Sequence, residues 1–287
     1  TPAQPDAMFA LGVMSGNDRD YATADTLLMP LLDGPRSDDA AFQLGRFAEA
    51  RRDFPRALSF YQRVESGARA FDAAIRQAAV LADMGRIDEA RSELQELRDD
   101  YPQLADRFLL AEIELLLNRS RHDDALALLN DGLKSEPTDT DLLYSRSLVY
   151  EKIGKIADAE KDLRSVLATE PDDARSLNAL GYMLAVHTKR LDEAHQLVGR
   201  ALALDPDDAA ILDSMGWVEF KRGNLTAATE LLRRAFADFP DPEVAAHLGE
   251  VLWQLGKKDE ARGVWDSALR ESPEHPVLRE TVQRLTQ

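Results

Sequence analysis

Histidine, carboxylate and hydroxyl side chains are the groups of this 287-residue chain that could take part in catalysis or metal binding, because cysteine is absent. Two of the five histidines, His187 and His195, flank one predicted turn. A zinc site takes at least three protein ligands, and the neighbouring acidic residues Asp192 and Glu193 suit the start of a helix better. We therefore expect surface histidines here and no metal.

Motifs of the common catalytic machineries are missing from the sequence. It contains no His-Glu-x-x-His, no Gly-x-Ser-x-Gly and no glycine-rich phosphate loop. The 52 aspartate and glutamate residues are scattered over predicted exposed helix faces, where carboxylates are solvated and not paired for acid–base work. We expect a protein that is not an enzyme, with no catalytic residue and no cofactor.

The excess of acidic residues limits the kinds of partner that this chain can bind. The formal net charge is −17 at pH 7, and nucleic acids and anionic membrane surfaces are polyanions that such a chain repels. No apolar run approaches the roughly 18 residues of a membrane span. We expect no nucleic-acid partner and no direct insertion of this chain into a membrane.

The helices that position the polar and aromatic side chains can be predicted from a sequence pattern that repeats about every 34 residues. Helix pairs approach closely only where the crossing side chains are small, and a proline after the second helix ends it. A second small residue precedes most of the repeating alanines by twelve positions, and a proline follows six of them by twelve. The alanines are Ala24, Ala57, Ala90, Ala125, Ala159, Ala194, Ala228 and Ala261. This period is typical of a solenoid of helix pairs.

Eight such units and a final helix cover nearly the whole chain, which we expect to form a single repeat domain over residues 1–287. Residues 30–39 are the least regular stretch and predict a longer loop between units. Residues 276–287 predict a helix that caps the exposed end of the stack. The units span about residues 5–37, 38–70, 71–103, 104–139, 140–173, 174–208, 209–241 and 242–275.

The pattern resembles the tetratricopeptide repeat family, in which Leu-Gly marks the first helix and Ala with an aromatic residue marks the second. Leu-Gly pairs end at Gly12, Gly45, Gly181 and Gly249, and Met215-Gly216 is a close variant. Tyr61 and Trp265 stand at the aromatic position. The resemblance implies an all-α fold, a right-handed α-solenoid of about eight tetratricopeptide repeats with a C-terminal capping helix and a concave groove lined by the first helices.

In proteins that resemble this one, the first-helix positions one and four residues after the small residue face the groove. These groove-facing positions are occupied by Arg46 and Glu49 in the second unit and by four aromatic residues in the last three units. Such rings can anchor a bound peptide, but they can equally fill the gap between neighbouring first helices. Both roles stay open for Tyr182 and Phe220, and binding is favoured for the two tryptophans. The expected protein-binding residues are Asn178, Tyr182, Asp213, Trp217, Phe220 and Trp253.

A narrower resemblance covers residues 177–285. The runs 177–182, 211–218 and 242–253 are similar to a proteobacterial group of outer-membrane lipoproteins. The resemblance implies an adaptor of the periplasm, anchored in the outer membrane through an N-terminal lipid that this chain does not carry. Such an adaptor binds a carboxyl-terminal processing protease and cell-wall hydrolase substrates, and so promotes their proteolysis.

Two functions of different classes stay open on the sequence. One is this adaptor or scaffold, and the other is a structural subunit of an envelope complex or homo-oligomer that does not use its groove for peptides. The sequence predicts no particular oligomeric state. A clamp for the carboxylate end of chaperone tails is not expected, because Ser145 stands where the clamp has an asparagine.

Overall fold

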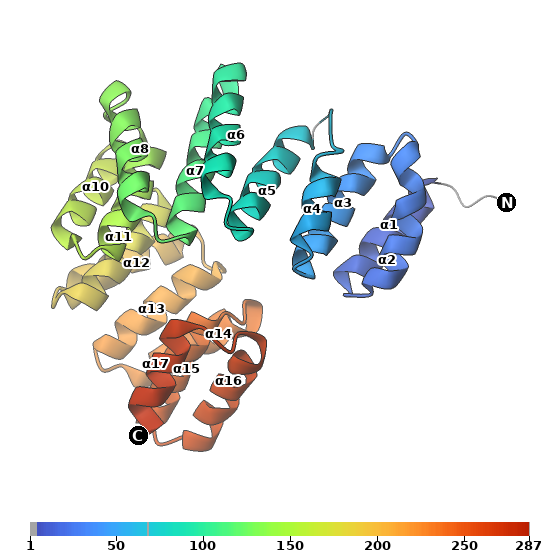
Figure 1. The fold of residues 1–287 in the computed structure, drawn as a ribbon. Coiled ribbons are helices and arrows are strands. Elements are labelled where there is room, and N and C mark those ends of the chain that lie inside the picture. The colour runs from blue at the N-terminus through green and yellow to red at the C-terminus, as the bar shows by residue number, and fades with distance from the viewer. Residues whose placement is uncertain (1–4, 68, 287) are drawn as a thin grey trace. The chain divides into compact units, whose positions relative to one another are not determined.

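The computed structural model describes residues 5–67 and 69–286, and no strand occurs among them. Among these residues, each predicted repeat unit matches two α-helices to within one residue of its bounds, and a final helix follows the eighth unit (Figure 1). The all-α repeat fold expected from the sequence is confirmed.

The chain divides into two compact units, one up to Leu128 and one from Leu129 onward, whereas the sequence predicts a single repeat domain. In residues 5–67 and 69–128, the first unit holds seven α-helices, the first half of an eighth and two short 3-10 helices. In order these are α1 Pro5–Asn17, α2 Tyr21–Leu28, η1 Met29–Asp33, α3 Ser37–Ala50, α4 Phe54–Tyr61, α5 Ala70–Asp83, α6 Ile87–Asp100, η2 Pro102–Leu104, α7 Ala105–Asn118 and α8 His122–Ser135. The stretch predicted as a loop, 30–39, therefore holds most of η1 and the start of α3.

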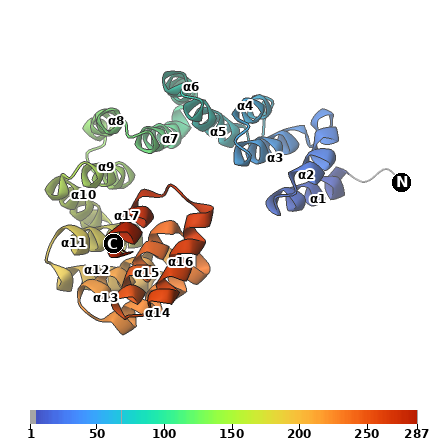
Figure 2. The same ribbon diagram turned by 60° about the horizontal axis from the view of Figure 1, so that its bottom comes forward.

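Up to residue 286, where the described part ends, the second unit holds the rest of α8 and nine further helices, which Figure 2 shows in a second view. They are α9 Thr140–Lys152, α10 Ile156–Thr169, α11 Ala174–His187, α12 Leu191–Leu204, α13 Ala209–Lys221, α14 Leu225–Asp238, α15 Pro242–Gln254, α16 Lys258–Glu271 and α17 Pro276–Thr286.

Small residues sit at the helix crossings, as the repeat pattern predicts. All eight repeating alanines are fully buried. At Gly181 on α11, an added Cβ atom would lie 2.5 Å from Val198 Cγ2 and 3.0 Å from the carbonyl oxygen of Ala194, both on α12. At Gly216 on α13, it would lie 2.6 Å from Leu232 Cγ on α14. Glycine is used here because the partner helix leaves no room for a side chain.

The ends of the first and second helices follow the local sequence. Four first helices are followed by a glycine in the left-handed region, with φ between 76° and 88°, where other residues are strained. Several helices begin after an aspartate whose carboxylate accepts a hydrogen bond from a backbone amide of the first turn, which stabilises the helix start. These aspartates are Asp20, Asp53, Asp139, Asp173, Asp208 and Asp241.

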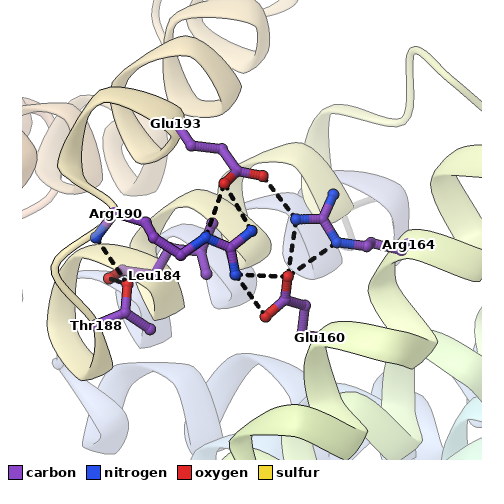
Figure 3. A network of polar contacts seen from close by, with 6 residues as sticks. All are labelled: Glu160, Arg164, Leu184, Thr188, Arg190 and Glu193. Carbon is purple, nitrogen blue, oxygen red and sulfur yellow. Dashed lines mark hydrogen bonds and ion pairs between the residues drawn. The ribbon is translucent and has the colours of Figure 1, made fainter.

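An ion-pair network joins α10 and α12 on the second-helix side of unit 2 (Figure 3). Arg190 donates to Glu160 at 2.8 Å, and Arg164 donates to Glu193 at 2.6 Å and to Glu160 at 2.8 Å. Burial acts to raise the pKa of Glu160, but the hydrogen bonds from Arg190 and Arg164 outweigh it and lower that pKa. Arg164, with a smaller contribution from Arg190, lowers the pKa of Glu193.

The final helix, α17, packs more extensively against α15 than against α16. Its Leu278 side chain is fully buried, and Val282 and Leu285 pack against the same apolar cluster. Arg284 Nη2 lies 2.6 Å from Glu250 Oε2, and the Glu250 side chain is almost completely buried on α15. This helix therefore covers the first-helix side of the last repeat.

Candidate functional site

A pocket of about 320 Å³ opens on unit 2 between α11, the start of α13 and the connection from α14 to α15. It combines two aromatic rings, Tyr182 and Phe239, with three carboxylates and several small apolar side chains. The carboxylates belong to Asp213, Asp241 and Glu243. We call this site the acidic pocket.

One wall of the acidic pocket is fixed by a buried histidine. Both carboxylate oxygens of Asp213 lie 3.0 Å from Nδ1 of His247, which is therefore the nitrogen that donates. The imidazole ring of His247 stacks on the indole of Trp217, with centroids 4.1 Å apart and an interplanar angle of 23°. The three residues come from neighbouring first helices, α13 and α15, so repeat stacking holds the carboxylate of Asp213 in one orientation.

Tyr182 also lines the acidic pocket, and it lies beside the same histidine. Its hydroxyl lies 3.5 Å from His247 Nε2, on the ring edge away from Asp213. Burial raises the pKa of Tyr182 far above its ordinary value, and the carboxylate of Asp213 adds to the effect. The phenol therefore stays protonated and presents a neutral hydroxyl to the imidazole of His247.

The mouth of the acidic pocket is more open. Phe239, the residue after α14, is 59% exposed, which is unusual for a ring of this size. Asp241 is held in place because its carboxylate accepts a 2.7 Å hydrogen bond from the backbone amide of Glu243 at the start of α15. An exposed ring beside carboxylates can hold an amphipathic cationic side chain, such as lysine or arginine, from a protein partner.

The six residues predicted to bind protein are not brought together in one surface. Tyr182 and Asp213 line the acidic pocket. Asn178 does not line it, and its side-chain oxygen is buried with no hydrogen-bond partner among the described residues. Trp253 is half-buried on α15, with its ring centroid 5.6 Å from that of Trp265.

The sequence predicts Trp217 and Phe220 on an open groove, but in the structure both belong to a buried apolar cluster of the last repeats. Each is 8% exposed, and their ring centroids are 4.9 Å apart. Trp217 is covered because His247 of the next repeat stacks on its face. This is the position of a packing residue, and a direct binding role for either ring stays a prediction.

Four residues of the site were not predicted from the sequence: His247, Phe239, Asp241 and Glu243. His247 follows Asp213 by 34 positions, one repeat period, and this spacing was the available signal that the two lie on adjacent first helices. Phe239 precedes the connection to α15, where no periodic pattern marks which side chains are exposed.

The remaining histidines of interest pair with carboxylates. His187 Nε2 lies 3.1 Å from Glu151, and His195 Nε2 lies 2.8 Å from Glu219. Within residues 5–67 and 69–286, no group of three or more histidine or acidic side chains is arranged to hold a metal ion. In the same part of the chain, no helix has both the length and the apolar character needed to cross a membrane.

Comparison with known proteins agrees with the repeat architecture. Family models described as tetratricopeptide repeat match residues 39–66, 75–140, 144–209 and 214–276. The TPR repeat-containing protein PA4667 of Pseudomonas aeruginosa is 44% identical over 212 residues, which cover 74% of this chain and 36% of that protein. The chain thus spans about a third of the length of this relative.

Solved structures show the same fold at low sequence identity. A tetratricopeptide repeat protein of Parabacteroides merdae superimposes with a TM-score of 0.62 at 15% identity, over 88% of this chain and 100% of that one. A thermophilic TPR protein of Thermus thermophilus, TTC0263, gives a TM-score of 0.57 at 24% identity, over 63% of this chain and 99% of that one. Because the family models match most of its residues, the chain belongs to the tetratricopeptide repeat family.

Proposed function

We propose that this protein is an adaptor of the bacterial envelope that binds a carboxyl-terminal processing protease and its cell-wall hydrolase substrates, and so promotes their proteolysis. Its tetratricopeptide repeats make it a protein–protein interaction scaffold. The adaptor role is supported by the resemblance of residues 177–285 to envelope lipoproteins. The proposal places the protein in the periplasm, held at the outer membrane through an N-terminal lipid outside this chain.

The observation that carries a binding role for unit 2 is the acidic pocket. Binding sites on proteins combine an aromatic anchor with a few fixed polar groups, and Phe239, Tyr182 and Asp213 supply both. The oriented carboxylate of Asp213 gives specificity for a positive charge, while the open ring of Phe239 supplies apolar contact. A lysine or arginine side chain on the surface of the partner fits this combination.

An adaptor of this kind needs no reaction of its own. Holding protease and substrate on one chain converts their encounter into an event at high effective concentration. The rate of proteolysis then rises without any catalytic residue in the scaffold.

The test is a binding measurement with the double variant Phe239→Ala/Glu243→Gln. Both side chains are exposed and neither makes a side-chain hydrogen bond within the described part of the chain, so the fold is expected to survive. The double variant is expected to bind the purified protease or hydrolase about tenfold more weakly in biolayer interferometry, the size of one moderate interface contact.

The matched control is Leu204→Ala/Glu230→Gln, which removes one exposed apolar side chain and one carboxylate elsewhere in unit 2. It is expected to bind like the parent. If the parent and Phe239→Ala/Glu243→Gln bind both partners with equal affinity, the acidic pocket is not the binding site. Light scattering that shows a concentration-dependent homo-oligomer without partner binding would favour a structural assembly subunit instead.

A further inference from the structure

Unit 1 carries a locally basic surface within an acidic chain. The whole chain has 52 acidic against 35 basic residues, yet residues 41–80 hold seven arginines against four carboxylates. Three of these arginines and two others from unit 1 line a pair of adjoining pockets of about 380 and 440 Å³. We call this surface the arginine groove; its cations are Arg19, Arg46, Arg69, Arg76 and Arg107, and its carboxylates are Glu49 and Asp72.

Repeat stacking creates the arginine groove. Arg46 lies on α3, Arg76 on α5 and Arg107 on α7, which are successive first helices. The two pockets share Arg46 and Arg76, so they form one continuous surface. Arg69 precedes α5 and lies over the ring of Phe42, with its guanidinium carbon 5.0 Å from the ring centroid. This cation–π contact fixes the direction of one guanidinium group.

The carboxylates of the arginine groove accept hydrogen bonds from only some of its guanidinium N–H groups. Glu49 accepts from Arg76 at 3.1 Å and from the hydroxyl of Tyr61 at 2.7 Å. Asp72 is shared by Arg69, at 3.7 Å, and Arg107. Two carboxylates therefore serve three guanidinium groups that carry five N–H donors each.

Arg46 has a neutral hydrogen-bond partner and not a carboxylate. It donates to the neutral amide oxygen of Gln43 at 2.9 Å, and no carboxylate in the described part of the chain lies within 4.0 Å of it. The side chains of its neighbours Arg69, Arg76 and Arg107 are 44–47% exposed, so their donors reach solvent. A ligand with carboxylates can complete these hydrogen bonds bidentately.

We propose that the arginine groove binds an acidic segment of a partner protein through the side chains of internal aspartate and glutamate residues. The long-range field of a chain with a net charge of −17 repels polyanions. Recognition therefore depends on close contacts in the groove, and the interspersed Glu49 and Asp72 favour spaced carboxylates over a continuous phosphate backbone. This site lies in unit 1 and does not rest on the acidic pocket of unit 2.

The test uses fluorescence anisotropy with a labelled, C-terminally amidated peptide in which six glutamates alternate with glycine and serine residues, and with the same peptide carrying a free C-terminal carboxylate. A peptide with six glutamines in their place is the ligand control. The double variant Arg46→Gln/Arg76→Gln is compared with Arg63→Gln/Arg86→Gln, which removes the same charge from exposed positions outside both pockets. Circular dichroism melting checks that each variant is folded.

The parent and the control variant are expected to bind the glutamate peptide alike. The groove variant is expected to bind it at least tenfold more weakly, since each lost charged hydrogen bond is worth about a factor of ten. Binding of the parent is also expected to weaken as salt is raised.

Four results would overturn the proposal. They are equal binding of the glutamine peptide, equal losses in the two double variants, tighter binding of a single-stranded oligonucleotide of equal charge, and binding that requires a free C-terminal carboxylate on the peptide. The last result would point to recognition of a chain end and not of internal side chains.

Discussion

Two glycines of the sixth repeat allow a direct test of the helix-crossing argument. Gly199 lies inside α12, and an added Cβ there would meet nothing within 4 Å. Gly181 lies inside α11, where an added Cβ would meet Val198 Cγ2 at 2.5 Å and a backbone oxygen of Ala194 at 3.0 Å. The same substitution to alanine therefore changes helix propensity equally at both positions and changes packing at only one.

The two substitutions are expected to change the free energy of unfolding in opposite directions. Gly199→Ala is expected to stabilise the protein by about 0.5–1 kcal/mol, because alanine is the better helix former. Gly181→Ala gains the same amount from propensity but overpacks the crossing, which costs about 1–3 kcal/mol. The backbone oxygen of Ala194 cannot move aside as a flexible side chain could, so the net effect is expected to be destabilising by up to about 2 kcal/mol.

Calorimetric melting and hydrogen exchange measure these effects. In a unit of this size, each kcal/mol shifts the melting temperature by about 2–4 °C. Because stability in repeat proteins is a sum over neighbouring repeats, loss of amide protection in Gly181→Ala should concentrate in α11, α12 and the adjacent helices. The double variant Gly181→Ala/Val198→Ala removes the nearest clashing methyl group and should recover part of the loss. Equal stabilisation by Gly181→Ala and Gly199→Ala would refute the packing argument.

Two further predictions concern ion pairs of unit 2. Arg190→Gln removes one donor from the network in Figure 3, whose two carboxylates have lowered pKa values. The stabilisation is therefore present above the ordinary glutamate pKa of 4.5 and is lost as pH falls through the lower folded values. Relative to the parent, the free energy of unfolding of this variant should fall by up to about 1 kcal/mol at pH 7 and by less at pH 3, as measured by urea denaturation. An equal or larger loss at pH 3 would show that the ionised carboxylates are not the source of the stabilisation. Arg284→Gln leaves the buried carboxylate of Glu250 without its arginine, which should cost about 1–3 kcal/mol and speed hydrogen exchange in α15 and α17; unchanged exchange would show that the ion pair does not hold α17.

The helices and their crossings could be predicted because the same few local signals recur from repeat to repeat. The alanine at every crossing is fully buried, and in the described residues each predicted unit matches two helices that extend at most one residue beyond its bounds. Turn glycines, aspartate caps and small crossing residues act within one repeat, so a single sequence is enough to find them.

The surface was harder to predict because it depends on how neighbouring repeats rotate against one another. Trp217 is on the expected helix, but whether its ring is open is decided by His247, which comes from the next repeat. The sequence places Arg46 on a first-helix face, but a groove forms only because Arg76 and Arg107 come beside it from later helices. Phe239 lies in a connection with no periodic pattern, so its exposure is visible only in three dimensions.

The most direct test of the proposed adaptor role is the rate at which the purified protease degrades its hydrolase substrate with and without this chain. Catalytic amounts of the parent chain are expected to accelerate degradation. Phe239→Ala/Glu243→Gln is expected to accelerate degradation less, while Leu204→Ala/Glu230→Gln is expected to match the parent. The same degradation rate with and without the parent chain, under conditions where the three proteins are folded, would show that this chain is not such an adaptor.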